Sequence, residues 1–443
     1  MRRPKHRPRN FGSISRGTVI DRVAIISDDF DGGGGAAAIA AASVRQLRRQ
    51  GVALTMLTGG LPPAGPTGPA DSIVSLGGQH LLDGGRARAA VRGLYDGAVR
   101  ARLAQWIDAN DTPGTVYHLH NWHKVLSPAA FAPLRRVADR LVVSTHDFFL
   151  SCPNGGYFDF RRGAACELAP MSARCLAVNC DKRHYGHKLW RVARQAVREG
   201  LFDFRTSGAT VLAVHEGMIP LLARRGIPAT AISVLRNPVS PWRSRRIAAE
   251  RNRSLLYVGR LELDKGVDTL AAAARSIGAP LTIVGDGPLR DTLRDLCPGV
   301  ELLGRQPPEA IGAIAATARL AVLPTRVRET FGLVAIEAAM SGLPVVSSTS
   351  ALVTDELVAI GAGLPCAPGD PDALARRLAA LLDDDGRVQA MSRSGFAAAR
   401  ALAPTEDQWG ARLLDIYNQV LTRPRGLELR GPGGRQPPVP AAS

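Results

Sequence analysis

Short apolar segments alternate with longer segments of helical character along nearly the whole chain. The predicted strands of the first half are Val19–Ser27, Val52–Thr58, Val116–His120, Leu141–Thr145, Val211–His215 and Ala231–Leu235. Those of the second half are Ser254–Gly259, Leu281–Gly285, Val300–Leu303, Leu320–Pro324 and Pro344–Ser348. Near-continuous apolar runs are typical of strands buried on both faces of a parallel sheet. The alternation therefore predicts an α/β protein with two doubly wound, Rossmann-like domains that face each other across a cleft, where ligands bind beyond the carboxyl ends of the strands.

A turn-rich and arginine-rich stretch that begins at Asn237 separates the two halves. Both ends of the chain are basic, and the last 20 or so residues are rich in Pro and Gly, which predicts disorder at the ends. The expected organisation is a basic disordered tail over 1–17, a first domain over 18–240 with a cysteine-containing insertion over 147–185, a second domain over 241–403, a crossover helix back to the first domain over 404–422, and a disordered tail over 423–443.

The charge balance of the chain indicates anionic partners. The chain has 56 Lys and Arg against 39 Asp and Glu, a net charge of +17. Such a surplus suits phosphorylated substrates, an anionic membrane surface or nucleic acid. The tails lack interleaved aromatic residues and nucleic-acid motifs, so nucleic acid is not expected. Six cysteines are too few for a disulfide scaffold, and no apolar run is long enough to span a membrane. These features predict a cytoplasmic protein, with peripheral attachment to the inner face of the cell membrane as an extension of that prediction.

The most informative pattern for function lies between residues 323 and 346. A predicted strand ends at Pro324, a loop carries Glu329, and a helix begins near Gly332, so that Glu337 lies early in the helix. The free N–H groups at a helix start bind anions. Two carboxylates and this helix start can therefore face one ligand.

This segment resembles the signature of retaining, family-4-type glycosyltransferases with the GT-B fold (glycosyl transferases group 1). Further matches follow in the right order. Tyr257-Val-Gly-Arg-Leu-Glu-Leu-Asp-Lys-Gly-Val looks like the diphosphate-binding turn of this family, Val284-Gly-Asp-Gly-Pro resembles its nucleotide-side loop, and Arg236-Asn-Pro-Val resembles its inter-domain turn. The resemblance implies transfer of a sugar from a nucleoside-diphosphate sugar with retention of configuration, in bacterial polysaccharide or glycolipid assembly. Together with the charge, it favours a lipid-linked saccharide as acceptor.

The resemblance also implies roles for single residues. Arg260 and Lys265 are expected to neutralise the diphosphate leaving group where other enzymes use a metal, so no cofactor is expected for catalysis. Glu329 is assigned to the donor sugar and Glu337 to the ribose. Asp29-Phe-Asp31 is similar to a metal motif of another glycosyltransferase fold and is interpreted as a coincidence. The other expected donor-binding residues are Gly34, Gly35, Gly259, Gly285, Asp286, Phe331, Gly332 and Leu333.

Histidines lie at the ends of two predicted strands in the first half. His118 and His120 alternate along one strand and share a face, and His146 ends the next strand. The resemblance favours His120 as the residue that contacts the donor sugar. His118, His146 and Asn237 are further candidates for the cleft. A metal site at the histidines is the weaker alternative.

The insertion contains Cys152, Cys166, Cys175 and Cys180. Their spacing departs from the paired cysteines of common zinc folds. A structural zinc and four free thiols are the two open interpretations.

The segment after the insertion places Arg191, Arg194 and Arg198 at helical spacing, and Leu189, Val192 and Ala196 form an apolar face. This pattern predicts a contact with a membrane surface or a lipid diphosphate. The alternative is a solvated basic face over a core helix.

Two other functions remain open from the sequence alone. A nucleotide-sugar epimerase uses the same architecture, with acid and base carboxylates in the cleft and no acceptor site. A non-catalytic protein that binds sugar nucleotides or polyanions is the second alternative.

Overall fold

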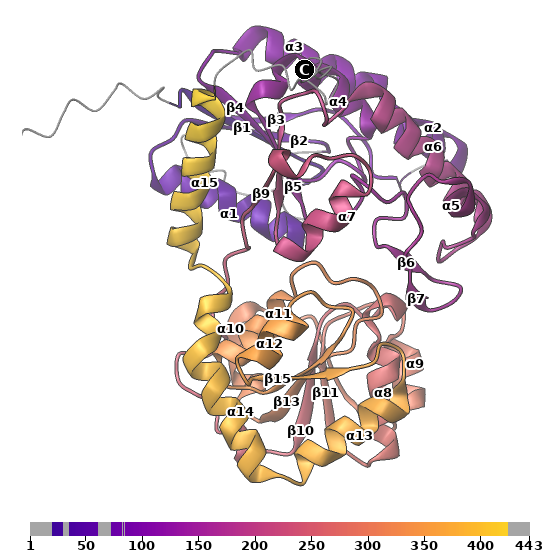
Figure 1. Cartoon of the computed structure of the whole chain (residues 1–443), viewed down its shortest axis with the longest axis vertical. Coiled ribbons are helices and arrows are strands. Elements are labelled where there is room, and N and C mark those ends of the chain that lie inside the picture. The colour runs from indigo at the N-terminus through magenta and orange to yellow at the C-terminus, as the bar shows by residue number, and fades with distance from the viewer. Residues whose placement is uncertain (1–19, 30–34, 61–71, 82, 84, 424–443) are drawn as a thin grey trace, which may run out of the picture.

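The computed structural model describes residues 20–29, 35–60, 72–81, 83 and 85–423 (Figure 1). Two parallel sheets, each with helices on both faces, form two domains, one above the other in Figure 1. This arrangement confirms the predicted pair of doubly wound α/β domains. Within the described residues, every helix is too short or too polar to cross a lipid bilayer.

The first sheet has seven strands in the order β3-β2-β1-β4-β5-β8-β9. The chain runs outward from β1 in one direction and from β4 in the other, so the strand order reverses between β1 and β4. Ligands of doubly wound folds bind at this switch point, outside the carboxyl ends of the strands. The strands are β1 (Arg22–Ser27), β2 (Leu54–Thr58), β3 (Ser72–Ser75), β4 (Thr115–Leu119), β5 (Leu141–Thr145), β8 (Thr210–Ala213) and β9 (Ile232–Val234).

The second sheet has six strands in the order β12-β11-β10-β13-β14-β15, and its switch point lies between β10 and β13. The loops after β10 and β13 carry the predicted motif residues, so the fold brings these motifs together. The strands are β10 (Ser254–Val258), β11 (Leu281–Val284), β12 (Glu301–Gly304), β13 (Ala318–Leu323), β14 (Val345–Ser348) and β15 (Gly363–Cys366).

Two edge strands were not predicted by the apolar pattern. β3 is four residues long and only partly buried, and β15 contains both Gly and Pro. Short or proline-containing strands occur at sheet edges, where one side needs no partner, and they lack the long apolar run of a central strand. The insertion adds a small antiparallel pair, β6 (Phe158–Asp159) and β7 (Ala164–Ala165).

The helices pack on both faces of their own sheet. Those of the first domain are α1 (Gly35–Arg49), α2 (Arg86–Leu94), α3 (Gly97–Asn110), α4 (Phe131–Leu134), α5 (Ala173–Ala177), α6 (Tyr185–Leu201) and α7 (Ile219–Ala223). Those of the second domain are α8 (Val267–Ser276), α9 (Arg290–Leu296), α10 (Pro308–Ala315), α11 (Leu333–Met340), α12 (Thr354–Ala359), α13 (Pro371–Leu382) and α14 (Asp385–Ala398).

Helix α15 (Glu406–Thr422) returns from the second domain to the first, as the yellow helix in Figure 1 shows. A capping box between Thr405 and Gln408 starts the helix, because each side chain bonds the backbone N–H of the other residue. Its apolar face, which includes Trp409 and Tyr417, packs in one buried cluster with β1 and β2. Helix α15 therefore belongs to the core of the first domain.

The two chain segments that cross between the domains lie beside each other. Val239 N–H donates to Pro404 O over 3.1 Å. Arg236 binds Glu216 of the first domain at 2.6 Å and Glu356 of the second at 2.5 Å. This ion-pair network joins the domains at their connection.

Candidate functional site

The loops after β10 and β13 bring two charged residues into contact at the switch point of the second sheet. Lys265 Nζ donates to Glu329 Oε2 over 2.5 Å. The Lys265 ammonium lowers the pKa of Glu329, which is therefore ionised at neutral pH. The Gly332 N–H also helps to lower the pKa of this carboxylate. The two residues that the sequence pattern assigns to one ligand thus lie in direct contact, and they do so at a helix start.

The start of α11 is built around Gly332. Its φ of +77° lies in the left-handed region, and a Cβ there would lie 2.7 Å from Val353 Cγ1, so a larger residue would not fit. Phe331 precedes it and is 2% exposed, which anchors the loop in the core. The first turn of α11 carries no acidic residue. Its free N–H groups and helix dipole therefore keep their positive potential.

Helix α1 of the first domain begins next to the same place. A Cβ on Gly35 would lie 3.6 Å from Leu333 Cδ1, in the first turn of α11. The first turn of α1 also lacks acidic residues. Two positive helix ends from different domains therefore meet at one location, which suits a doubly charged anion such as a diphosphate. Gly34 and Asp31 lie outside the described residues.

Gly259 and Gly285 allow the loops after β10 and β11 to approach each other closely. Gly285 has a φ of +141°, and a Cβ there would lie 1.8 Å from Gly259 O. The Gly259 N–H donates to Val284 O over 2.9 Å. Asp286 is exposed, and its Oδ1 accepts a bond from the Gly287 N–H over 2.8 Å. Only glycines permit this close approach of the two loops.

Arg260 lies at the surface of the same turn, with its side chain 55% exposed. Its guanidinium donates to Glu262 Oε1 over 2.5 Å and lies 3.9 Å from Asp264. Burial and the neighbouring Glu262 carboxylate raise the pKa of Asp264. Arg260 is thus held by an acid of its own turn rather than by Glu329.

Glu337 lies one helical turn inside α11 and contacts the linker. Trp242 Nε1 donates to Glu337 Oε2 over 3.2 Å. Burial raises the pKa of Glu337 to about 7. Trp242 was not singled out from the sequence, because a tryptophan in a turn-rich linker carries no signal for a buried carboxylate partner.

His118 does not line a cleft, and this expectation is corrected. The residue is fully buried, with Nδ1 2.6 Å from the hydroxyl of Tyr417 and Nε2 2.8 Å from Ser144 Oγ. Burial lowers the pKa of His118 to about 3, so the ring is neutral. Alternation along β4 places the side chain on a buried face, where it holds helix α15 to the sheet.

His120 and His146 form a chain of hydrogen bonds with Ser43. The Ser43 hydroxyl donates to Ile39 O, so its oxygen accepts from His120 Nε2, which lies 3.2 Å away. His120 Nδ1 is then the acceptor for His146 Nε2, at 3.3 Å. This network assigns His146 the Nε2–H tautomer and leaves its Nδ1 as an acceptor. Burial lowers the pKa of His146 to about 4, so neutral rings carry this chain at neutral pH.

The backbone of His146 reaches the second domain. Thr330 Oγ1, in the loop that carries Glu329, donates to His146 O over 2.9 Å. His120 is 2% exposed, whereas His146 is partly exposed. The structure thus places His146 nearer than His120 to the loop that carries Glu329. Asn237 lies in the inter-domain crossing and is 5% exposed.

Two carboxylates near the histidines were missed by sequence reasoning. Asp28 accepts three backbone N–H bonds, from Lys124, Val125 and Leu126, at 2.8–2.9 Å, and so shapes the loop after β4. Asp147 directly follows His146, and burial raises its pKa to about 6. The only available signal for Asp147 was its position after a strand-end histidine.

The insertion touches the second domain beside the turn after β10 that carries Arg260 and Lys265, called the charged turn below. Lys182 Nζ lies 3.4 Å from Glu262 Oε2. Glu167 accepts from Arg224 of the first domain at 2.6 Å and pairs with Arg328 of the Glu329 loop. The insertion is therefore a bridge between the two domains at one edge of the site.

The four insertion cysteines are free thiols here. The buried Lys188 Nζ lies 3.4 Å from Cys175 Sγ and 3.2 Å from Cys180 Sγ. Among the described residues, the metal-ligating groups that lie within 4.8 Å of one another are His215, Glu216 and Glu356, and Arg236 already pairs with both of these glutamates. The cysteines do not form such a group, so this arrangement lends no support to zinc at Cys152, Cys166, Cys175 and Cys180.

The basic face predicted on α6 is buried, which corrects the expected membrane contact. Arg194 is 4% and Arg198 is 3% exposed, and Arg191 forms an ion pair with Asp181 at 3.0 Å. Leu189, predicted to lie on the apolar face, is 46% exposed. The helix is thus rotated relative to the expectation, with its arginines inward.

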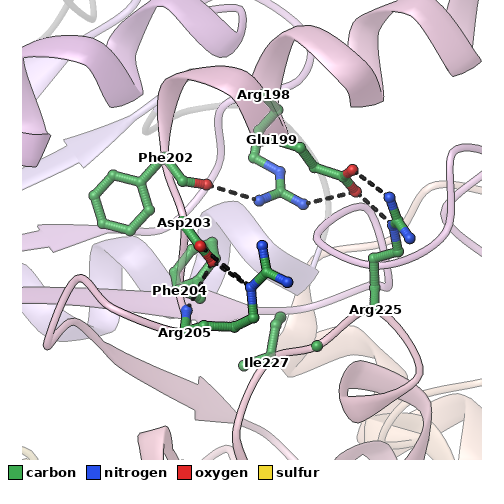
Figure 2. Close-up of a pocket in the computed structure, with 9 residues that line it drawn as sticks. Arg198, Glu199, Phe202, Asp203, Phe204, Arg205, Arg225 and Ile227 are labelled. Carbon is green, nitrogen blue, oxygen red and sulfur yellow. Dashed lines mark hydrogen bonds and ion pairs between the residues drawn. The ribbon is translucent and has the colours of Figure 1, made fainter. Parts of the chain in front are cut away.

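Figure 2 shows a hollow at the C-terminal end of α6. Arg198, Arg205 and Arg225 surround it. Glu199 pairs with Arg225 at 2.5 Å, and Asp203 pairs with Arg205 at 2.9 Å. The segments that line the hollow precede β8 and β9, whereas the switch point lies at the carboxyl ends of the strands, so the hollow is separate from the site described above.

Comparisons with known proteins indicate a family and a fold. Residues 252–384 match the family described as "Glycosyl transferases group 1". A glycogen synthase of Mycobacterium tuberculosis is 35% identical over 285 residues, which cover 60% of this chain and 65% of that protein. A protein of Corynebacterium glutamicum, named as a GDP-mannose-dependent monoacylated alpha-(1-6)-phosphatidylinositol monomannoside mannosyltransferase, is 35% identical over 175 residues, or 35% of this chain and 45% of that protein. The chain therefore matches less than two thirds of the length of either relative.

Solved structures match over most of the chain. Sucrose-phosphate synthase from Thermosynechococcus elongatus has a TM-score of 0.67 and 19% identity, covering 90% of this chain and 99% of that one. HepE from Anabaena, in complex with UDP and glucose, has a TM-score of 0.60 and 16% identity, with the same coverages of 90% and 99%. At these identities the likeness establishes the fold, which is GT-B.

Proposed function

We propose that this chain, which belongs to the group 1 glycosyltransferases through residues 252–384 and has the GT-B fold, transfers a sugar from a nucleoside-diphosphate sugar to an acceptor with retention of configuration. The observation that carries the proposal is the contact of Lys265, Glu329 and the Gly332 N–H at the start of α11, opposite the start of α1. It supplies positive charge for a diphosphate and a carboxylate for a sugar within one small volume.

The donor diphosphate takes the place beside Lys265 and the two helix starts. Arg260 is exposed and turns from Glu262 to the same phosphates. Glu329 then accepts hydrogen bonds from sugar hydroxyls, and Glu337 accepts them from the ribose. The HepE complex with UDP and glucose supports a nucleotide donor for this fold.

In the transfer step, the bond between the anomeric carbon and the phosphate oxygen breaks, and negative charge develops on the departing diphosphate. Lys265, Arg260 and the N–H groups of α11 stabilise that charge. The acceptor hydroxyl attacks from the same face and gives its proton to the departing phosphate, so that configuration is retained. Glu329 has a lowered pKa and is paired with Lys265, which makes it a poor base and suits a positioning role. No metal takes part in this scheme.

A lipid-linked saccharide is the proposed acceptor class. The name of the Corynebacterium relative describes an acceptor that is a mannosylated phosphatidylinositol. The net charge of +17 suits work at an anionic surface. The protein is therefore proposed to act in the cytoplasm, at the inner face of the membrane, in polysaccharide or glycolipid assembly.

Incubation with a panel of UDP-, GDP- and ADP-sugars tests the proposal, with release of the nucleoside diphosphate as the readout. We expect one donor to release its nucleoside diphosphate slowly alone, by hydrolysis, and faster with a lipid extract, by transfer of the sugar to an acceptor. The anomeric configuration of the product, determined by NMR, should match that of the donor. Formation of an epimerised sugar nucleotide, or donor binding without turnover, would contradict the proposal.

A further inference from the structure

Exposed apolar side chains are concentrated on two neighbouring helices. Among the described residues, six large hydrophobic side chains are exposed, and four of them lie on or next to α2 and α6. They are Val91 at 67%, Tyr95 at 38%, Tyr185 at 38% and Leu189 at 46%. Single exposed apolar residues are ordinary, but a concentration of this kind marks a contact surface.

Helices α2 and α6 pack against each other at the surface of the first domain, side by side in Figure 1. Trp190 Nε1 donates to Ala90 O over 2.9 Å, and its ring fills the space beside Gly93. Tyr185 and Leu189, four residues apart, are exposed along one side of α6. The buried residues of α6 are Lys188, Arg194, Gln195 and Arg198. The exposed sides of the two helices, together with the exposed residues directly before α6, are called the α2/α6 face below.

The α2/α6 face is basic. Arg86 and Arg88 are exposed on α2, and Lys182 and Arg183 are exposed just before α6. The sequence of α2 contains no carboxylate, and that of α6 contains only Glu199, in its last turn. Apolar and tyrosine side chains beside basic ones are the composition of helices that lie in the interface of an anionic bilayer.

We propose that the α2/α6 face docks this protein onto an anionic lipid bilayer, with Val91 and Leu189 in the interfacial layer and the arginines on lipid phosphates. Charge excludes the nearest competitors for this face. The chain ends outside the described residues are themselves basic, and a second copy would set arginines against arginines. An acidic protein would also complement the positive charge of this face. The membrane that is proposed to hold the acceptor already supplies an anionic surface, so no protein partner is needed.

The face also lies close to the candidate site. Lys182, three residues before α6, contacts Glu262 in the turn that carries Arg260. A bilayer at the α2/α6 face would therefore bring a lipid-borne acceptor to the edge of the cleft. This step rests on the proposed function, whereas membrane docking itself is measured without any activity.

Flotation with vesicles of phosphatidylcholine, with or without phosphatidylglycerol, tests the proposal. We expect the full chain to bind the anionic vesicles at low salt, to release with added salt, and to bind neutral vesicles weakly. Replacing Arg86, Arg88 and Arg183 by Gln should weaken binding about fivefold per arginine, or about one hundredfold together. The double variant Val91→Asp, Leu189→Asp should abolish it.

Matched controls come from the second domain. Arg243, Arg245 and Arg251 are exposed, and their replacement by Gln removes the same charge with an expected loss of less than about threefold. Val358→Asp tests an apolar residue that is 40% exposed elsewhere. Circular dichroism of all variants should match the wild type, because every changed side chain is exposed.

Three results would overturn the proposal. They are absence of binding to anionic vesicles at low salt, equal losses in the face and control variants, and a wild-type dimer in analytical ultracentrifugation that Leu189→Asp converts to monomer. The last result would assign the face to a second copy of the chain. Nucleoside diphosphate release with a soluble acceptor tests the transferase separately and should be unchanged in the face variants.

Discussion

The charged turn of the second domain and helix α6 of the first present the same chemistry in opposite surroundings. Lys265 meets Glu329 and a helix start at the switch point, and Arg260 is 55% exposed beside it. Arg194 and Arg198 are almost fully buried. Both groups were predicted from the sequence to face anions. A charge that follows a strand in a glycine-rich loop has its direction set by the loop, whereas charges at helical spacing fit either side of a helix.

The inward arginines of α6 meet loop carbonyls that lie outside regular secondary structure. Arg194 donates to His123 O at 2.9 Å, and Arg198 donates to Leu150 O at 2.9 Å and to Phe202 O at 3.2 Å. Buried carbonyls of irregular segments need such donors. Arg194 also stacks near Trp190, with its guanidinium carbon 5.0 Å from the ring centre. Carbonyls of irregular segments on both sides of the insertion and within it therefore hold the arginines inward.

The largest expected effect is on the charged turn. Lys265→Ala should lower kcat by roughly 10²–10³, the scale of losing one donor to a developing oxyanion. Glu329→Gln should also impair turnover, because its charge is lost from the sugar side. The assay is release of the nucleoside diphosphate with saturating donor. Arg400→Ala, an exposed change in the second domain, should leave kcat unchanged, and near-normal turnover in both site variants would refute the assignment.

A buried and an exposed arginine should differ in their contribution to the free energy of unfolding. Arg198→Leu should lower the free energy of unfolding by about 2–4 kcal/mol, because it leaves buried carbonyls without donors. Arg412→Leu, at an exposed position inside α15, should change it by less than about 0.5 kcal/mol, since Leu and Arg have similar helix propensities. Urea unfolding followed by fluorescence measures both. Equal effects of the two substitutions would show that the inward arginines of α6 do not stabilise the first domain.

Donor binding should depend on pH because Glu337 titrates near neutral pH. Its raised pKa of about 7 means that the carboxyl is largely protonated below neutral pH in the free protein. The ionised form accepts ribose hydroxyls better, so KM for the donor should fall several-fold as pH rises from about 6 to 8. The hydrogen bond from Trp242 holds this pKa down, so Trp242→Phe should move the midpoint to higher pH by about half to one unit. In Glu337→Gln the transition should vanish, and its persistence there would assign the titration to another group.

The smallest expected effect is that of metal removal. Since Arg260, Lys265 and two helix starts supply the positive charge, activity should survive EDTA. Metal content is measured first by mass spectrometry, because a structural zinc in the insertion would complicate the comparison. Loss of activity with EDTA and recovery with Mg²⁺ or Mn²⁺ would instead give Asp29 and Asp31 a ligand role.

The two parallel sheets were predictable from the sequence alone, and so were the residues proposed for the second-domain site. Long buried strands leave an apolar run that nothing else explains, and Gly259, Gly285 and Gly332 stand where a Cβ would collide with backbone or side chain. Such local constraints are written into short stretches of sequence. The family resemblance implied that Lys265 and Glu329 bind one ligand, although 64 residues separate them, and their direct contact is seen only in the structure.

Which histidine lies nearer to the second domain, and which side of α6 is buried, depend on the tertiary structure. His118 and His120 share a strand face, but helix α15, nearly 300 residues later, covers His118 through Tyr417. The direction of α6 depends on carbonyls in loops around residues 123, 150 and 202, which no periodicity within the helix reveals. Both outcomes depend on contacts between distant segments, and such contacts exist only once the chain has folded.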